Sequence, residues 1–289
     1  MKLKTLVAAL AVAGVAPAFA AISPGSPQTG ANLPYNGNGE LFLTVFDSSA
    51  KISYTLDLGA KQNDFFAAAQ GVDAGYSRSW AVGDANFASF LSQTSLANLQ
   101  WAVLAIDQTG GTAVGGVRLF STLKNGQDSE FPLFTNQLFS QGMGSTQAGT
   151  FFNAINTTGT HGVVGQALNY GVNGSSVNKD ADSGNSYFGD GSVGLSSNLN
   201  GNAPFSVANA VGESSAFYYI RRSSTNQLDS VAFDTFANQG GDAVFSFADT
   251  GNGYTLNYAL APVPEPESLA MLLAGLGVVG MMFRRRRVD

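Results

Sequence analysis

The chain has 289 residues, a formal net charge of −6 at pH 7 and no cysteine. The lack of cysteine excludes disulfides, thiol nucleophiles and cysteine-ligated metals. Between Ala21 and Val263 there are 8 Lys and Arg against 17 Asp and Glu, and the basic residues form no cluster. Nucleic acid is therefore not expected as a partner. The roughly 240 residues in this stretch suffice for one sizeable hydrophobic core.

The first 20 residues have the three parts of a secretory signal peptide. Two lysines come first, residues 6–16 are apolar, and Ala18 and Ala20 form an A-x-A cleavage site. We therefore expect a signal peptidase to cut after Ala20 and the rest of the chain to be exported. Residues 21–39 are rich in Pro, Gly, Asn and Ser, which predicts a flexible leader.

Ordered structure is expected from residue 40 onward. Residues 40–47 and 51–58 are two strand-like runs joined by a short Ser-Ser-Ala turn, and the second run alternates apolar and polar side chains, which predicts a β-hairpin. Asp84 is placed to cap a short helix over residues 84–92. The other elements expected in this half are a short helix at 64–70, a buried strand at 101–107 and its partner strand at 115–123.

The second half predicts two short helices, a loop region and a second set of strands. The helices are expected at 131–141 and 147–155, and residues 159–204, dominated by Gly, Asn and Ser, predict loops or very short strands. Strands are expected at 214–222, 228–236, 243–248 and 254–260. Regular strands with Gly and Asn turns predict a mainly β fold, an antiparallel β-sandwich-like ectodomain with a few short helices over residues 40–260.

The C-terminal segment, residues 261–289, combines a proline-rich stretch, an apolar stretch and a basic cluster. Pro264 and Pro266 hold the first part extended, the shape that a processing protease needs. Residues 268–283 predict a single transmembrane helix. Its apolar part, residues 269–283, would be about 22 Å long, which is short against a bilayer core of about 30 Å, so the helix is expected to anchor only transiently. The four arginines that follow should stay on the cytoplasmic side of the inner membrane.

This order of parts resembles the PEP-CTERM sorting signal of Gram-negative bacteria. The V-P-E-P motif is Val263, Pro264, Glu265 and Pro266, and the basic cluster is Arg284, Arg285, Arg286 and Arg287. The resemblance implies recognition by an exosortase, a membrane-embedded protease or transpeptidase. It also implies export to the cell surface or extracellular space of a bacterium that forms exopolysaccharide, flocs or biofilm. Nothing in it assigns an activity to the ectodomain.

The sequence offers no catalytic constellation and one candidate metal site. His161 is the single histidine, it lies in a Gly-rich loop, and no G-x-S-x-G motif is present, so we expect no enzyme activity. No cofactor is expected except calcium, which the hard oxygen ligands Asn178, Asp180, Asp182 and Asp190 would suit. The stretch fails the EF-hand pattern, and a solvated turn explains the same residues.

Three functions remain open. The first is a non-enzymatic surface or matrix protein linked to exopolysaccharide, biofilm or flocs, with exopolysaccharide as a candidate partner. The second is a carbohydrate- or ice-binding module, for which Tyr76 and Trp80 are the aromatic residues to test. The third is an exported hydrolase. The sequence leaves open whether the processed protein is released or attached to the surface.

Overall fold

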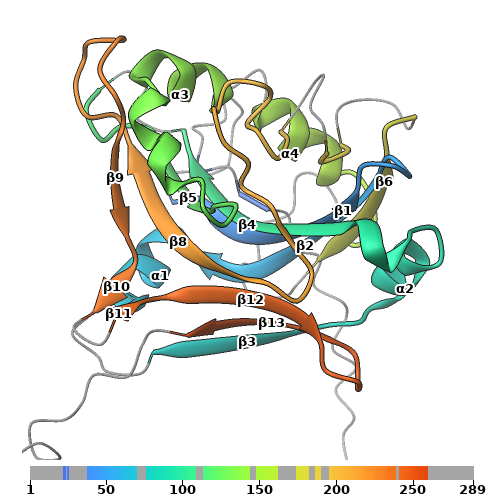
Figure 1. Cartoon of the computed structure of the whole chain (residues 1–289). Helices are drawn as coiled ribbons and strands as arrows, with labels where there is room; N and C mark the ends of the chain where they lie inside the picture. Colours follow the sequence, from blue (N-terminus) through green and yellow to red (C-terminus); the bar gives the residue numbers. More distant parts are fainter. Residues whose placement is uncertain are drawn as a thin grey trace, which may run out of the picture.

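The computed structural model describes residues 22–23, 25, 38–69, 76–108, 113–143, 148–161, 174–181, 186–189, 195–238 and 241–259. Over these residues the chain is mainly β with a few short helices, as the sequence predicts (Figure 1). The strands are β1 (Glu40–Asp47), β2 (Ile52–Lys61), β3 (Ser77–Val82), β4 (Leu99–Asp107), β5 (Arg118–Thr122), β6 (Ser175–Lys179), β7 (Asn209–Ala210), β8 (Ser214–Arg221), β9 (Ala232–Thr235), β10 (Ala237–Asn238), β11 (Gly241–Asp242), β12 (Val244–Asp249) and β13 (Tyr254–Ala259). The helices are α1 (Gln62–Ala69), α2 (Ala85–Leu91), α3 (Asn136–Gly142) and α4 (Thr150–Ile155), with 3-10 turns η1 (Leu96–Asn98) and η2 (Asp128–Leu133).

Most of the strands belong to one antiparallel sheet that curls on itself. Its order is β3-β13-β12-β8-β5-β4-β1-β2-β6, with β7 paired to β4 and β9 to β8. The long strand β8 joins two leaves, because its first residues pair with β12 and its later residues pair with β5. Figure 1 shows the lower leaf, β12, β13 and β3, folded beneath the upper leaf.

The structure agrees with the predicted sandwich only in the way these two leaves pack against each other. They face each other across a core, but they are leaves of one continuous sheet and not separate sheets. A strand that changes partners along its length, as β8 does, can turn the corner without breaking the hydrogen-bond ladder. The fold is therefore a curled antiparallel sheet.

Both faces of the upper leaf are buried. The concave face holds one apolar cluster between the leaves, which includes Leu43, Tyr54, Trp80 and Phe245. The convex face of the upper leaf holds a second cluster, which includes Phe42 and Phe152. This is why β1, with the sequence ELFLTVFD, is buried at all eight positions and carries apolar side chains on both faces.

The short helices close the open sides of these two cores. In Figure 1, α1 and α2 lie at opposite ends of the space between the leaves, while α3 and α4 cover the convex face of the upper leaf. The side chain of Asp84 accepts a hydrogen bond from the amide of Phe87 at 2.8 Å, which confirms the predicted cap of α2. The helix predicted at 131–141 is instead divided into η2, which contains Pro132, and α3, which Thr135 caps.

Two other differences concern strands. The sequence analysis missed β3, which pairs with β13 at the edge of the lower leaf. Its pattern is weak because only Trp80 and Val82 are buried among its six residues. The strand predicted at 228–236 is shorter than expected, because Ser224, Asn226 and Asp229 form a hydrogen-bonded turn ahead of β9.

Candidate functional site

Two buried carboxyl groups lie at one end of the upper leaf. Glu40 is the first residue of β1, and Asp57 lies in the middle of β2, which is paired with β1. The register of the pair shifts between Glu40 and Phe42, so the strands are irregular at this point. Both carboxylic residues are fully buried, at 0% exposure.

Each of the two carboxyl groups accepts one backbone hydrogen bond. An oxygen of Glu40 accepts from the amide of Ser23 at 2.9 Å, and the amide of Glu40 donates to the carbonyl of Ser23 at 3.0 Å. An oxygen of Asp57 accepts from the amide of Gly59 at 2.7 Å, and Gly59, within β2, has a positive φ of 60° that glycine adopts without strain. The second oxygen of each group has no hydrogen-bond partner among the described residues.

Burial changes the protonation of this pair. Loss of solvent, and then the charge of Asp57, raises the pKa of Glu40 to about 9, although the Ser23 amide and Lys61 oppose the shift. Loss of solvent raises the pKa of Asp57 to about 7 against the hydrogen bond from Gly59. At neutral pH Glu40 therefore keeps its proton, and the pair can share a proton as coupled acids do. With no exposed surface, neither group can contact a substrate in this conformation.

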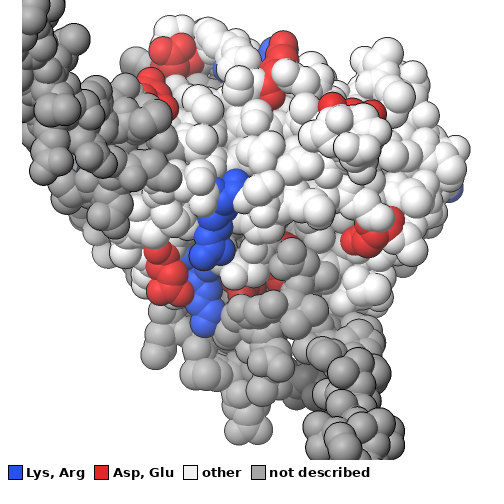
Figure 2. Space-filling view, turned by 90° about the horizontal axis from the view of Figure 1, so that it is seen from below, with Lys and Arg blue, Asp and Glu red and all other residues white. Residues whose placement is uncertain are grey.

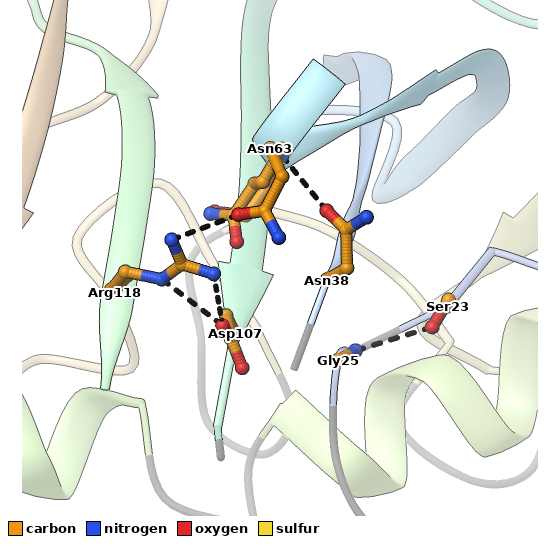
Figure 3. Close-up of polar contacts among 8 residues, drawn as sticks. Ser23, Gly25, Asn38, Asn63, Asp107 and Arg118 are labelled. Atoms are coloured by element: carbon orange, nitrogen blue, oxygen red, sulfur yellow. Dashed lines mark hydrogen bonds and ion pairs between the residues drawn. The ribbon is translucent and has the colours of Figure 1, made fainter. Parts of the chain in front are cut away.

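A polar network continues along the same end of the sheet. Figure 3 shows Arg118 between Asp107 and Asn63: its Nε and Nη2 donate to Oδ2 of Asp107 at 3.0 and 2.5 Å, and its Nη1 donates to Oδ1 of Asn63 at 3.0 Å. The amide of Asn63 in turn donates to the side chain of Asn38 at 2.8 Å. This network ties β4, β5 and the start of α1 to the residues that precede β1.

The same end of the sheet fixes a short N-terminal segment. Ile22 is fully buried, and Asn156 at the end of α4 makes two hydrogen bonds with it: the side-chain oxygen accepts from the Ile22 amide, and the side-chain nitrogen donates to its carbonyl, both at 2.9 Å. A Cβ atom added to Gly25 would lie 2.9 Å from the Cα atom of Asp107, so the chain passes too close for any larger residue. Ile22, Ser23 and Gly25 are thus fixed to the domain, within the segment for which the sequence predicts a flexible leader.

A buried polar row crosses the convex face of the upper leaf. Thr44 lies opposite Thr55, and Thr55 lies opposite Ser176, on β1, β2 and β6. All three hydroxyls are buried and have no hydrogen-bond partner among the described residues. Buried hydroxyl groups of this kind are the usual partners of ordered water.

Sequence reasoning missed this row and the carboxyl pair for one reason. Alternation along β2 predicts that Ser53, Thr55 and Asp57 face solvent, whereas the structure buries them. The signal that could have found them lies in β1. A strand that is apolar on both faces implies that both faces of its neighbour are covered too.

The predicted calcium residues are only partly described. Asp182 and Asp190 lie outside the described residues. Asn178 is buried on β6 and donates to the hydroxyl of Thr158 at 3.1 Å, while Asp180 pairs with Lys51 at 3.1 Å on the surface. Among the described residues no group of three or more His, Asp or Glu could hold a metal ion. Calcium stays a prediction.

The other sequence candidates are buried or partly buried. His161, for which the sequence predicts a surface or loop position, lies outside the helices and strands but is fully buried. Trp80 is 7% exposed and donates from its indole nitrogen to the carbonyl of Leu58 at 3.0 Å, so it belongs to the core and cannot form an exposed binding platform. Tyr76 is half-buried and packs against the rings of Phe65 and Tyr258.

The C-terminal signal lies beyond β13 and outside the described residues, including the transmembrane helix predicted at 268–283. No helix within the described part of the chain has the length and apolar character needed to cross a membrane.

Comparison with known proteins gives one match. A family model described as the PEP-CTERM protein-sorting motif matches residues 262–287, a range that contains the V-P-E-P residues 263–266 and the arginines 284–287. No curated protein and no solved structure matches the chain. Such a motif indicates an exported protein that is directed to the cell envelope or surface and processed by an exosortase, a membrane protease. The chain carries the PEP-CTERM sorting motif in its C-terminal region and is consistent with an exosortase substrate.

Proposed function

We propose that this chain is a non-enzymatic protein of the bacterial cell surface or extracellular matrix, and that it acts in exopolysaccharide-dependent biofilm or floc formation. The observation that carries the proposal is the sorting motif at residues 262–287, which begins shortly after β13 ends at Ala259. In this proposal the curled sheet is the domain that is exported to the cell surface. A signal peptidase and an exosortase process it, and the inner membrane of a Gram-negative cell holds it only transiently.

The buried acids and the buried histidine support a non-enzymatic role. Catalytic acids and bases must reach the proton that they transfer, within about 3 Å or through one water molecule. Glu40, Asp57 and His161 are all at 0% exposure, and they face packed protein. The exported-hydrolase alternative gains no support from the described residues.

The test is made in the cells that produce the protein. Deletion of residues 263–289 should remove processing, so that the protein no longer appears on the cell surface and the cells aggregate less. Replacement of the four arginines 284–287 by glutamine should retain unprocessed precursor in the membrane. Mass spectrometry of the mature C-terminus should locate a cut near the V-P-E-P residues. Unchanged surface display after the deletion would overturn the proposal.

The second candidate, a carbohydrate- or ice-binding module, is favoured by one surface of the lower leaf. Its convex face presents small, uncharged side chains in register across three strands. They are Val244, Ser246 and Ala248 of β12, Ala259, Asn257 and Thr255 of β13, and Ser77, Ser79 and Ala81 of β3. Figure 2, which views the molecule from below, shows a largely uncharged surface among the described residues. Such a regular, flat face suits a repeating hydroxylated surface.

Lysine substitution on this face tests the second candidate. Asn257→Lys should abolish glycan binding or thermal hysteresis, because a long charged side chain would stand up from the flat surface. Asn125→Lys, in an exposed turn elsewhere, is the matched control. A protein that gives no signal on a glycan array and no thermal hysteresis does not have this function.

A further inference from the structure

A pocket opens where β2 passes into α1 and β3 begins. Its volume is about 320 Å³, and its walls include Gly59, Lys61, Asp64, Phe65, Tyr76 and Arg78. This volume lies in the range of small-molecule sites, and it would take one or two sugar rings. Gly59 and Lys61 also neighbour the carboxyl pair, but Glu40 and Asp57 are themselves buried and do not line the pocket.

The apolar wall of the pocket is held rigidly by the core. The ring of Phe65 lies 4.8 Å from that of Tyr258 and 6.0 Å from that of Tyr76, in edge-on contacts. Tyr76 also contacts Tyr258 at 5.9 Å. A half-buried aromatic ring fixed in this way offers a firm apolar surface next to a polar rim, which is how aromatic residues serve binding sites.

The charged wall brings two cations together on an acidic domain. Lys61 is the last residue of β2, and Arg78 is the second residue of β3. Arg78 is exposed and forms no ion pair or hydrogen bond with any residue that the structure describes. Figure 2 shows a short run of basic side chains beside acidic ones on a face that is otherwise mostly uncharged. Two of the 8 basic residues between Ala21 and Val263 therefore line one pocket, where the domain carries 17 acidic residues.

These walls match the chemistry of an acidic sugar. A guanidinium and an ammonium group bind a carboxylate through charge-assisted hydrogen bonds. Asp64, the single carboxylate among the lining residues, can accept hydrogen bonds from ring hydroxyls, and Tyr76 can pack on the apolar face of a sugar ring. A neutral sugar would leave the guanidinium group of Arg78 without a counter-charge among the described residues. A simple anion would leave the aromatic wall and Asp64 unused, and Asp64 would repel it.

We propose that this pocket binds a uronic acid residue, a sugar ring that bears a carboxylate, within an acidic exopolysaccharide. The inference rests on the proposed function, because it names the class of polymer that the surface protein holds. Lys61 and Arg78 bind the carboxylate, Asp64 orients the ring hydroxyls and Tyr76 supports the ring.

The test uses the protein purified from exporting cells and titrated by calorimetry with oligoglucuronate. A neutral gluco-oligosaccharide of equal length and sodium sulfate are the comparison probes. We expect binding of oligoglucuronate that weakens with added salt, at least tenfold weaker binding of the neutral sugar, and no saturable binding of sulfate. Equal affinity for the neutral sugar, or no binding of oligoglucuronate, would overturn the proposal. Saturable binding of sulfate at the same site would show that the pocket is a simple anion site, and this result would also overturn the proposal.

Three variants distinguish binding in the pocket from non-specific attraction to the charge of the protein. Arg78→Gln should weaken oligoglucuronate binding at least tenfold, and Tyr76→Ala should weaken it further without changing its dependence on salt. Lys124→Gln, which removes the same charge from an exposed position after β5, should bind like the wild type. An equal loss in Arg78→Gln and Lys124→Gln would show non-specific attraction and contradict the proposal. Binding is measured in solution, so a failure of surface sorting leaves this result unaffected, and surface sorting can succeed when this binding fails.

Discussion

The buried pair of Glu40 and Asp57 predicts that the stability of the domain falls as pH rises. A carboxyl group whose pKa is higher in the folded than in the unfolded chain binds more protons when folded. Its contribution is fully present below the unfolded pKa and is lost as pH rises through the folded pKa. For Glu40 the window runs from its ordinary value of 4.5 to about 9.

The size of this loss of stability follows from the one proton that Glu40 holds in the folded chain and not in the unfolded chain. Between pH 6 and pH 8 an unfolded glutamate is ionised, whereas Glu40 keeps its proton in the fold. One proton of difference lowers the free energy of unfolding by about 1.4 kcal/mol per pH unit, and hence by about 2.7 kcal/mol over this interval. Asp57, whose pKa is raised to about 7, adds to the loss in the lower half of the window.

The assay is urea unfolding at pH 6, 7 and 8 of the wild type and of Glu40→Gln. Glutamine copies the shape of the protonated acid and cannot ionise, so the variant should lose about 1.4 kcal/mol per pH unit less stability than the wild type. The difference between the slopes of the two proteins carries the measurement, because groups that titrate in both proteins cancel in it. Glu130→Gln, in η2, is the matched control and should keep the wild-type slope. Equal slopes for the wild type and Glu40→Gln would refute the reasoning.

Three further predictions concern single contacts. Asn156→Ala removes two hydrogen bonds to the N-terminal segment and should destabilise the domain by about 1–2 kcal/mol in urea unfolding, whereas Asn153→Ala on the exposed side of α4 should change little. Thr55→Val replaces a buried hydroxyl without a partner by a methyl group, so the free energy of unfolding should stay the same or rise; a loss above about 2 kcal/mol would indicate a bound partner such as water. Arg118→Gln removes the ion pair with Asp107, whose side chain is 2% exposed, and thermal unfolding should report a loss of about 3 kcal/mol. Combining Arg118→Gln with Asp107→Asn should largely restore the stability.

The elements that the sequence predicted well are those specified by local chemistry. The hairpin of β1 and β2 has a clear alternation along β2 and a polar turn, and the helix after Asp84 has a side-chain cap. Both signals lie within a few residues. The same is true of the long run of Gly, Asn and Ser before residue 204, among whose described residues β6 is the one strand.

The features that escaped prediction depend on partners far apart in the chain. β3 is a strand because β13, about 175 residues later, provides its hydrogen bonds, and its own sequence has little apolar alternation. Glu40 and Asp57 become unusual acids only because the sheet and α4 exclude solvent from a face that looks polar in the sequence. The pocket at Lys61 and Arg78 likewise joins two strands that are not neighbours in the sheet.

The two ends of the described domain differ in a way that suits a protein processed at its C-terminal side. Ile22 is buried and held by Asn156, and β13 ends at Ala259, before the sorting motif begins at residue 262. Removal of residues 263–289 should therefore leave the free energy of unfolding within about 0.5 kcal/mol of the full chain. Removal of residues 21–25 should lower it by about 2–4 kcal/mol, because it exposes the site of one isoleucine and breaks its hydrogen bonds. Urea unfolding of the two truncated proteins decides the matter. Equal losses at both ends would mean that the C-terminal segment also belongs to the fold, and the sorting signal would then not be a separable part of this chain.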